Sequence, residues 1–183
     1  MAQVASSFGS SKNILLSSSL SFSTGTYSAV TALGSGSTAV GTITANLSSC
    51  RINSIELLTN QSGLQTATNQ GGVWPFSVYF FTSAPSITGG AVWAWQYSWA
   101  SSYLGGISVM ATSTGQSGAT GSVHSSALGF GYGTQPGIGG QGLDLIFNSS
   151  NILYFVVVSN YAIGAGTLSG SPALLLNLNV STL

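Results

Sequence analysis

Hydrophobic residues along the chain occur in short runs that are separated by glycine, serine and asparagine. They rarely recur at intervals of three and four residues, which argues against amphipathic helices. Thr38–Leu47 shows the alternation of a half-buried strand, with Val40, Ile43 and Leu47 among small polar residues. Turn-forming residues follow the runs at the spacing typical of an all-β antiparallel sandwich. We predict strands at Asn13–Phe22, Tyr27–Leu33, Thr38–Leu47, Arg51–Thr59, Trp74–Thr82, Ala91–Trp99, Gly106–Thr112, Ser122–Phe130, Leu143–Phe147, Asn151–Ser159 and Ala173–Val180.

The length of the chain, 183 residues, is that of a single domain. Met1–Lys12 is rich in serine and has no periodic hydrophobic pattern, so we interpret it as an N-terminal arm. Residues 13–183 then form one β-sandwich domain. Because terminal arms fray unless another surface holds them, we expect this arm to pack on a neighbouring subunit.

Charge is nearly absent from the sequence: only Lys12, Arg51, Glu56 and Asp144 are charged, and the net charge is zero. Binding to nucleic acid depends on a basic patch, which two basic residues cannot form. A metal site needs a cluster of Cys, His, Asp or Glu, so we expect neither a metal nor a cofactor. The longest apolar run, Ile152–Val158, is far shorter than the ~20 residues of a membrane-spanning helix, so no membrane partner is expected.

Because the chain has so few ionisable residues, we do not expect it to be an enzyme. His124 and Asp144 would need a serine nucleophile to form a triad, and the sequence has no nucleophile elbow around them. Glu56 and Asp144 would act as a glycosidase pair only if they met across a cleft. Arg51 and Glu56, five residues apart, point to opposite faces of their predicted strand. The single Cys50 excludes an internal disulfide and is expected to be a small buried hydrophobic residue.

Four aromatic residues, Trp93, Trp95, Tyr97 and Trp99, alternate with smaller ones. On a strand their side chains would all point to one face. We favour the interpretation that they fill the sandwich core or a subunit interface, where aromatic side chains bury much surface. The alternative is an exposed stacking platform for sugars, and the burial of the rings distinguishes the two.

Five segments together resemble a group of structural proteins of tailed-phage virions. They are Ile52–Leu58, Trp74–Pro85, Tyr103–Val109, Asn151–Ser159 and Leu174–Val180. In those proteins an I-x-S-V-x-L strand precedes an apolar L-x-L-x-F-F strand that leads to a proline. A G-x-V strand, an L-Y-x-V-V-V strand and a final alternating strand follow. The resemblance covers about residues 38–183 and implies a jelly-roll-like β-sandwich on a phage head, as a decoration or cement protein without catalytic residues.

The leading hypothesis is therefore a non-enzymatic structural protein of the virion, a capsid decoration or cement protein. It would be made in the host cytoplasm, would lie on the surface of the phage particle, and would contact other copies of itself in a homo-oligomer and the major capsid protein. A surface with so little charge favours self-association, which matters less for a subunit fixed in a lattice. The alternative hypothesis is a carbohydrate-binding or adhesive module, such as a fibre head or surface lectin, that uses the Trp93–Trp99 aromatic residues.

Overall fold

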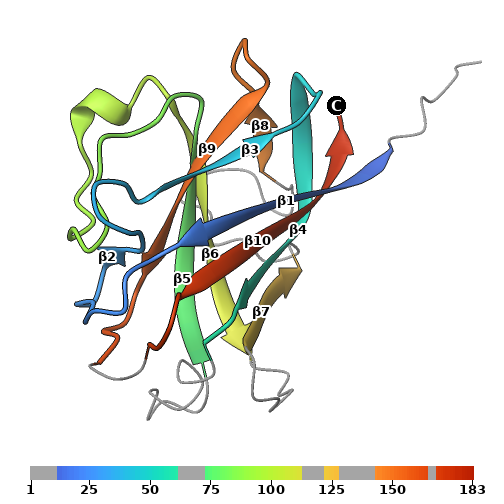
Figure 1. Ribbon diagram of the computed structural model, residues 1–183. Helices are drawn as coiled ribbons and strands as arrows, with labels where there is room; N and C mark the ends of the chain where they lie inside the picture. Colours follow the sequence, from blue (N-terminus) through green and yellow to red (C-terminus); the bar gives the residue numbers. More distant parts are fainter. Residues whose placement is uncertain (1–11, 62–72, 113–121, 128–142, 165–167) are drawn as a thin grey trace, which may run out of the picture.

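Two antiparallel β-sheets of five strands each pack face to face in the computed structural model (Figure 1). The structure describes residues 12–61, 73–112, 122–127, 143–164 and 168–183. The predicted arm, apart from Lys12, lies outside the described residues. Among the described residues, no helix has the length and hydrophobicity needed to cross a membrane.

The first sheet, called the β4 sheet here, has the strand order β1-β10-β4-β7, with β8 also beside β4. The second, the β5 sheet, has the order β2-β9-β5-β6, with β3 also beside β9. The bounds are β1 Asn13–Ser21, β2 Thr31–Ala32, β3 Val40–Thr44, β4 Ser49–Thr59, β5 Val73–Phe81, β6 Tyr103–Thr112, β7 Ser122–Ala127, β8 Asp144–Ile146, β9 Ile152–Ser159 and β10 Ala173–Thr182.

The strand pairs are nested along the chain. β1 pairs with β10, β2 and β3 pair with β9, β4 pairs with β7 and β8, and β5 pairs with β6. Successive pairs alternate between the two sheets, which is the arrangement of a jelly roll. The prediction of an all-β, jelly-roll-like antiparallel sandwich is confirmed.

The main core lies between the sheets and follows the alternation of the strands. β10 buries every second side chain, from Leu174 to Val180, and leaves those between them more exposed. The two sheets also approach each other at their edges, with β1 beside β3 and β6 beside β7. Ser18 Oγ donates a hydrogen bond of 2.5 Å to the carbonyl oxygen of Thr42 and so links the edges of the two sheets.

β9 departs from this alternation because both of its faces are buried. Leu153, Phe155 and Val157 point into the main core, whereas Val156 and Val158 belong to a second, smaller hydrophobic cluster. That cluster lies on the outer face of the β5 sheet. The segment that covers this face is residues 82–102, which connects β5 to β6 and is drawn in yellow-green at the upper left of Figure 1.

The predicted strand Ala91–Trp99 is wrong. In this range only Val92 forms a β-bridge, with Thr31, and Tyr97–Trp99 form a single turn of 3-10 helix, η1. The segment lies across a sheet face rather than along a sheet edge, so most of its backbone has no neighbouring strand. The predicted strand Tyr27–Leu33 is reduced to Thr31–Ala32 for the same lack of a paired neighbour, with one isolated bridge from Tyr27 to Ile163.

Cys50 is a free, fully buried cysteine in β4, between Leu145 of β8 and Thr182 of β10. Burial, together with the nearby Asp144 carboxylate, raises the pKa of its thiol from 9.0 to about 11. The prediction that Cys50 acts as a small buried hydrophobic residue is confirmed.

We predict that this thiol makes the fold sensitive to alkaline pH. A pKa that is higher in the folded than in the unfolded state stabilises the fold below pH 9, and this contribution is lost as pH rises towards 11. The free energy of unfolding of the wild type should therefore fall more steeply between these pH values than that of Cys50→Ala. Denaturant titrations at a series of pH values measure both slopes, and parallel curves would contradict the prediction.

Candidate functional site

The segment 82–102 is held on the β5 sheet by backbone contacts. Gly90 N–H donates to the carbonyl oxygen of Ala32 (3.0 Å), and Ala32 N–H donates to that of Ala91 (2.9 Å). Gly89 packs directly on the backbone of Gly34, since a Cβ atom at Gly89 would lie 2.5 Å from the carbonyl carbon and oxygen of Gly34. The absence of a side chain at Gly89 thus allows the segment to lie this close to the sandwich.

Aromatic side chains from this segment and from the β5 sheet form one cluster, which we call the aromatic cluster. Its members are Tyr79, Phe81, Trp93, Trp95, Trp99 and Tyr103. The ring of Trp93 stacks on that of Tyr79, with centroids 4.4 Å apart and 15° between the planes. Trp99 meets Phe81 edge to face at 6.2 Å, and Trp95 meets Tyr103 edge to face at 4.7 Å. Such offset and edge-to-face pairs stabilise beyond the area that they bury.

The four aromatic residues singled out from the sequence do not share one environment. Trp99 is buried and Trp93 is half-buried, whereas the side chains of Trp95 and Tyr97 are 50% and 92% exposed. The expectation that all four point to one face is wrong, because the chain turns into η1 at Tyr97. Trp93 and Trp99 anchor the segment, and Trp95 and Tyr97 are displayed to solvent.

A pocket of about 380 Å³ opens beside the aromatic cluster. It lies between the turn at Ser37–Thr38 and the segment 82–102, with Trp99 in its wall. Its lining contains hydroxyl and amide side chains and apolar ones, but no charged residue. Sequence reasoning missed this pocket, because its lining residues come from separate segments and, apart from Trp99, belong to no pattern that was singled out.

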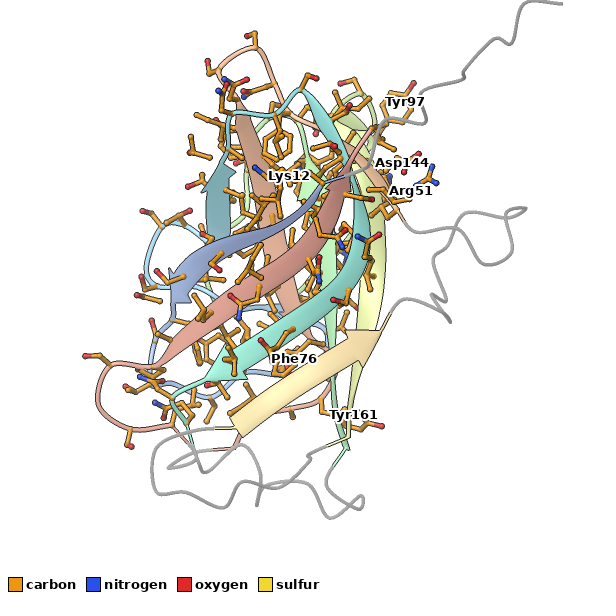
Figure 2. All side chains as sticks on the ribbon, turned by 90° about the vertical axis from the view of Figure 1, so that its right-hand side faces the viewer. Lys12, Arg51, Phe76, Tyr97, Asp144 and Tyr161 are labelled. Atoms are coloured by element: carbon orange, nitrogen blue, oxygen red, sulfur yellow. The ribbon has the colours of Figure 1, made fainter. Side chains whose placement is uncertain are left out.

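Arg51, Glu56 and Asp144 lie elsewhere, on the outer face of the β4 sheet, which Figure 2 shows from the front. The expectation that Arg51 and Glu56 point to opposite faces is wrong, because a register shift leaves Asn53 without a partner on β10 and so puts both side chains on one face. Arg51 Nε and Nη2 donate to the two carboxylate oxygens of Asp144 at 2.6 and 2.9 Å. These hydrogen bonds hold the pKa of Asp144 below its ordinary value. Glu56 accepts a hydrogen bond of 2.9 Å from Asn177 Nδ2. The groups are therefore satisfied by partners on their own sheet.

The catalytic arrangements considered from the sequence are not formed. Asp144 pairs with Arg51, five positions from Glu56 along β4, which corresponds to ~17 Å and is too far for a glycosidase pair. The backbone of His124 pairs with Leu57, ~20 Å along β4 from the partner of Asp144, so a triad of these two residues is not assembled. Among the described residues, no cluster of His, Cys, Asp or Glu could hold a metal ion.

Comparisons of the chain with protein-family models, with curated proteins and with solved structures gave no match. Functional arguments therefore depend on the surface and the pocket of this chain.

We predict that Trp99 and Tyr97, two residues apart in η1, contribute very differently to stability. Trp99→Ala should lower the free energy of unfolding by ~3–5 kcal/mol, because it removes a buried ring and leaves a cavity. Tyr97→Ala should change it by no more than ~0.5 kcal/mol, because that side chain is almost fully exposed. Denaturant unfolding of the two variants measures the difference, and equal losses would contradict the packing described here.

Proposed function

We propose that this protein is a non-enzymatic structural subunit of a virion, a decoration or cement protein on the head of a tailed phage. It contacts copies of itself and the major capsid protein. The jelly-roll topology is compatible with this role, and viral capsid proteins are among those that use it. Topology alone does not establish function, because the same fold hosts lectins and other proteins.

The outer face of the β4 sheet carries few charges and is internally hydrogen-bonded. Ser17 Oγ donates to Asn177 Oδ1 at 2.7 Å, and Asn177 in turn donates to Glu56, so three neighbouring strands are joined by one chain of polar side chains. Within the described residues, Arg51–Asp144 is the only salt bridge. A surface with few charges loses little solvation free energy when another subunit covers it. Such a surface suits a protein that is packed among neighbours.

The exposure of Trp95 and Tyr97 is the observation that carries the proposal. Both project from a segment that Trp93 and Trp99 hold firmly on the sandwich. Exposed aromatic side chains on a rigid base are typical of the residues that contribute most to binding at protein interfaces. We assign the contact with the capsid to this surface.

A second candidate function is the carbohydrate-binding or adhesive module. The observation that favours it is the uncharged pocket beside the aromatic cluster, rather than a flat platform of four rings. Its ligand is considered in the next subsection.

We predict that attachment to heads depends on Tyr97 and Trp95. Heads that lack the protein should bind added wild-type protein at a fixed stoichiometry, as measured by quantitative mass spectrometry of purified particles. Tyr97→Ser and Trp95→Ser should each weaken this binding by about tenfold or more, because each removes an aromatic contact worth ~2 kcal/mol.

The matched control is Tyr161→Ser. Tyr161 is also exposed, at 42%, but lies at the opposite end of the sandwich from Tyr97 in Figure 2. This variant should bind heads like the wild type. Absence of the protein from purified virions would refute the proposed function, and equal binding by all three variants would refute the assigned surface.

A further inference from the structure

The pocket beside the aromatic cluster has the dimensions of a small-molecule site. Its volume of about 380 Å³ is near the lower end of the ~300–1,000 Å³ that such sites occupy. It is large enough for a ligand of monosaccharide or disaccharide size. Part of its wall is preformed, because Val40 N–H donates to Thr38 Oγ1 at 3.2 Å and Ala39 N–H donates to the carbonyl oxygen of Ile87 at 3.2 Å.

The polar side chains of the pocket are available to a ligand. Ser86, Thr88 and Gln96 line it, and within the described part of the chain none of their side chains takes part in a hydrogen bond. Together they offer two hydroxyl groups and one amide, each of which can donate and accept. A ligand that carries several hydroxyl groups matches this set.

The remaining wall is apolar and uncharged. Val40, Ile87 and Val92 are the hydrophobic lining residues with accessible side chains, whereas Pro85 and Trp99, which also line the pocket, are buried. The four charged residues of the chain are absent from the lining, so a charged ligand would lose solvation without gaining a counter-charge. This excludes phosphorylated or acidic compounds as good ligands.

We propose that this pocket binds an uncharged pyranose sugar. A pyranose has an apolar face of C–H groups, which can pack on Ile87 and Val92, and a rim of hydroxyls, which can form hydrogen bonds with Ser86, Thr88 and Gln96. The sugar can be free or can be the terminal unit of a surface glycan. The inference is independent of attachment to a phage head, since Trp95 and Tyr97 are not among the residues that line the pocket.

Ligand-observed NMR with the full-length protein tests the proposal. The probes are glucose, galactose, mannose and N-acetylglucosamine, with glucuronate as the charged comparison. We expect at least one neutral sugar to bind with a Kd on the order of 1 mM and glucuronate to bind more weakly. Oligosaccharides that end in the same sugar distinguish a free ligand from a glycan terminus, since only a glycan site should bind the longer ligand more tightly.

Four variants locate the site. Thr88→Val and Gln96→Ala each remove hydrogen-bonding groups and should weaken binding roughly two- to tenfold. Ala94→Trp places a ring in the pocket and should abolish binding, whereas Ala100→Trp adds the same ring to an exposed position of the same segment outside the pocket and should not. Thermal unfolding verifies that both tryptophan variants are folded.

Two results would overturn the proposal. One is that no neutral sugar binds when its concentration is roughly ten times the expected Kd. The other is sugar binding by folded Ala94→Trp that equals binding by Ala100→Trp, which would place the sugar elsewhere. Neither result bears on attachment to heads, which the Tyr97→Ser experiment tests separately.

Discussion

The burial of the β5 sheet on both faces is the constraint on which the rest of the structure depends. One face packs on the β4 sheet through residues such as Phe76, Phe80 and Phe155. The other is covered by residues 82–102, which contribute Trp99 to a cluster with Phe81, Val156 and Val158. Because the chain has almost no charge, hydrophobic burial has to supply most of its stability.

The aromatic residues of segment 82–102 have two different roles. Trp93 and Trp99 pack on the sheet and fix the backbone, and this anchoring allows Trp95 and Tyr97 to be presented to solvent without collapsing onto the core. The pocket forms where the segment runs beside the Ser37–Thr38 turn. The proposed interface and the proposed sugar site are therefore consequences of one packing arrangement, although they use different side chains.

Sequence patterns predicted the strands well where the buried residues belong to a strand that is also hydrogen-bonded to its neighbours. The range Trp74–Thr82 differs from β5 by one residue at each end, and Asn151–Ser159 differs from β9 at one end only. The strand prediction Ala91–Trp99 failed because the spacing of the aromatic residues does not correspond to a common environment: Trp93 and Trp99 pack on a sheet face, whereas Trp95 and Tyr97 are exposed. The apolar run in β9 is typical of a strand that is buried on both faces, but the run does not identify the segment that covers its second face.

The candidate site was predictable only in part. The sequence singled out the aromatic residues of Trp93–Trp99, but their partners Tyr79 and Tyr103 come from other strands, and contacts between distant segments are not encoded in local spacing. The close approach of Gly89 to the backbone of Gly34 was not predictable either, since a single glycine in the sequence resembles any turn residue. Such contacts become apparent only when the fold brings the segments together.

The substitution Gly89→Ala tests most directly whether residues 82–102 pack tightly on the β5 sheet. Three of the four tryptophans lie in this segment, so their fluorescence reports on its packing. Because the new Cβ would clash with the backbone of Gly34, the emission should shift to the red and the free energy of unfolding should fall by ~1–3 kcal/mol. Gly25→Ala, where a Cβ meets nothing within 4 Å, should leave both unchanged. Wild-type emission and stability in Gly89→Ala would contradict the account.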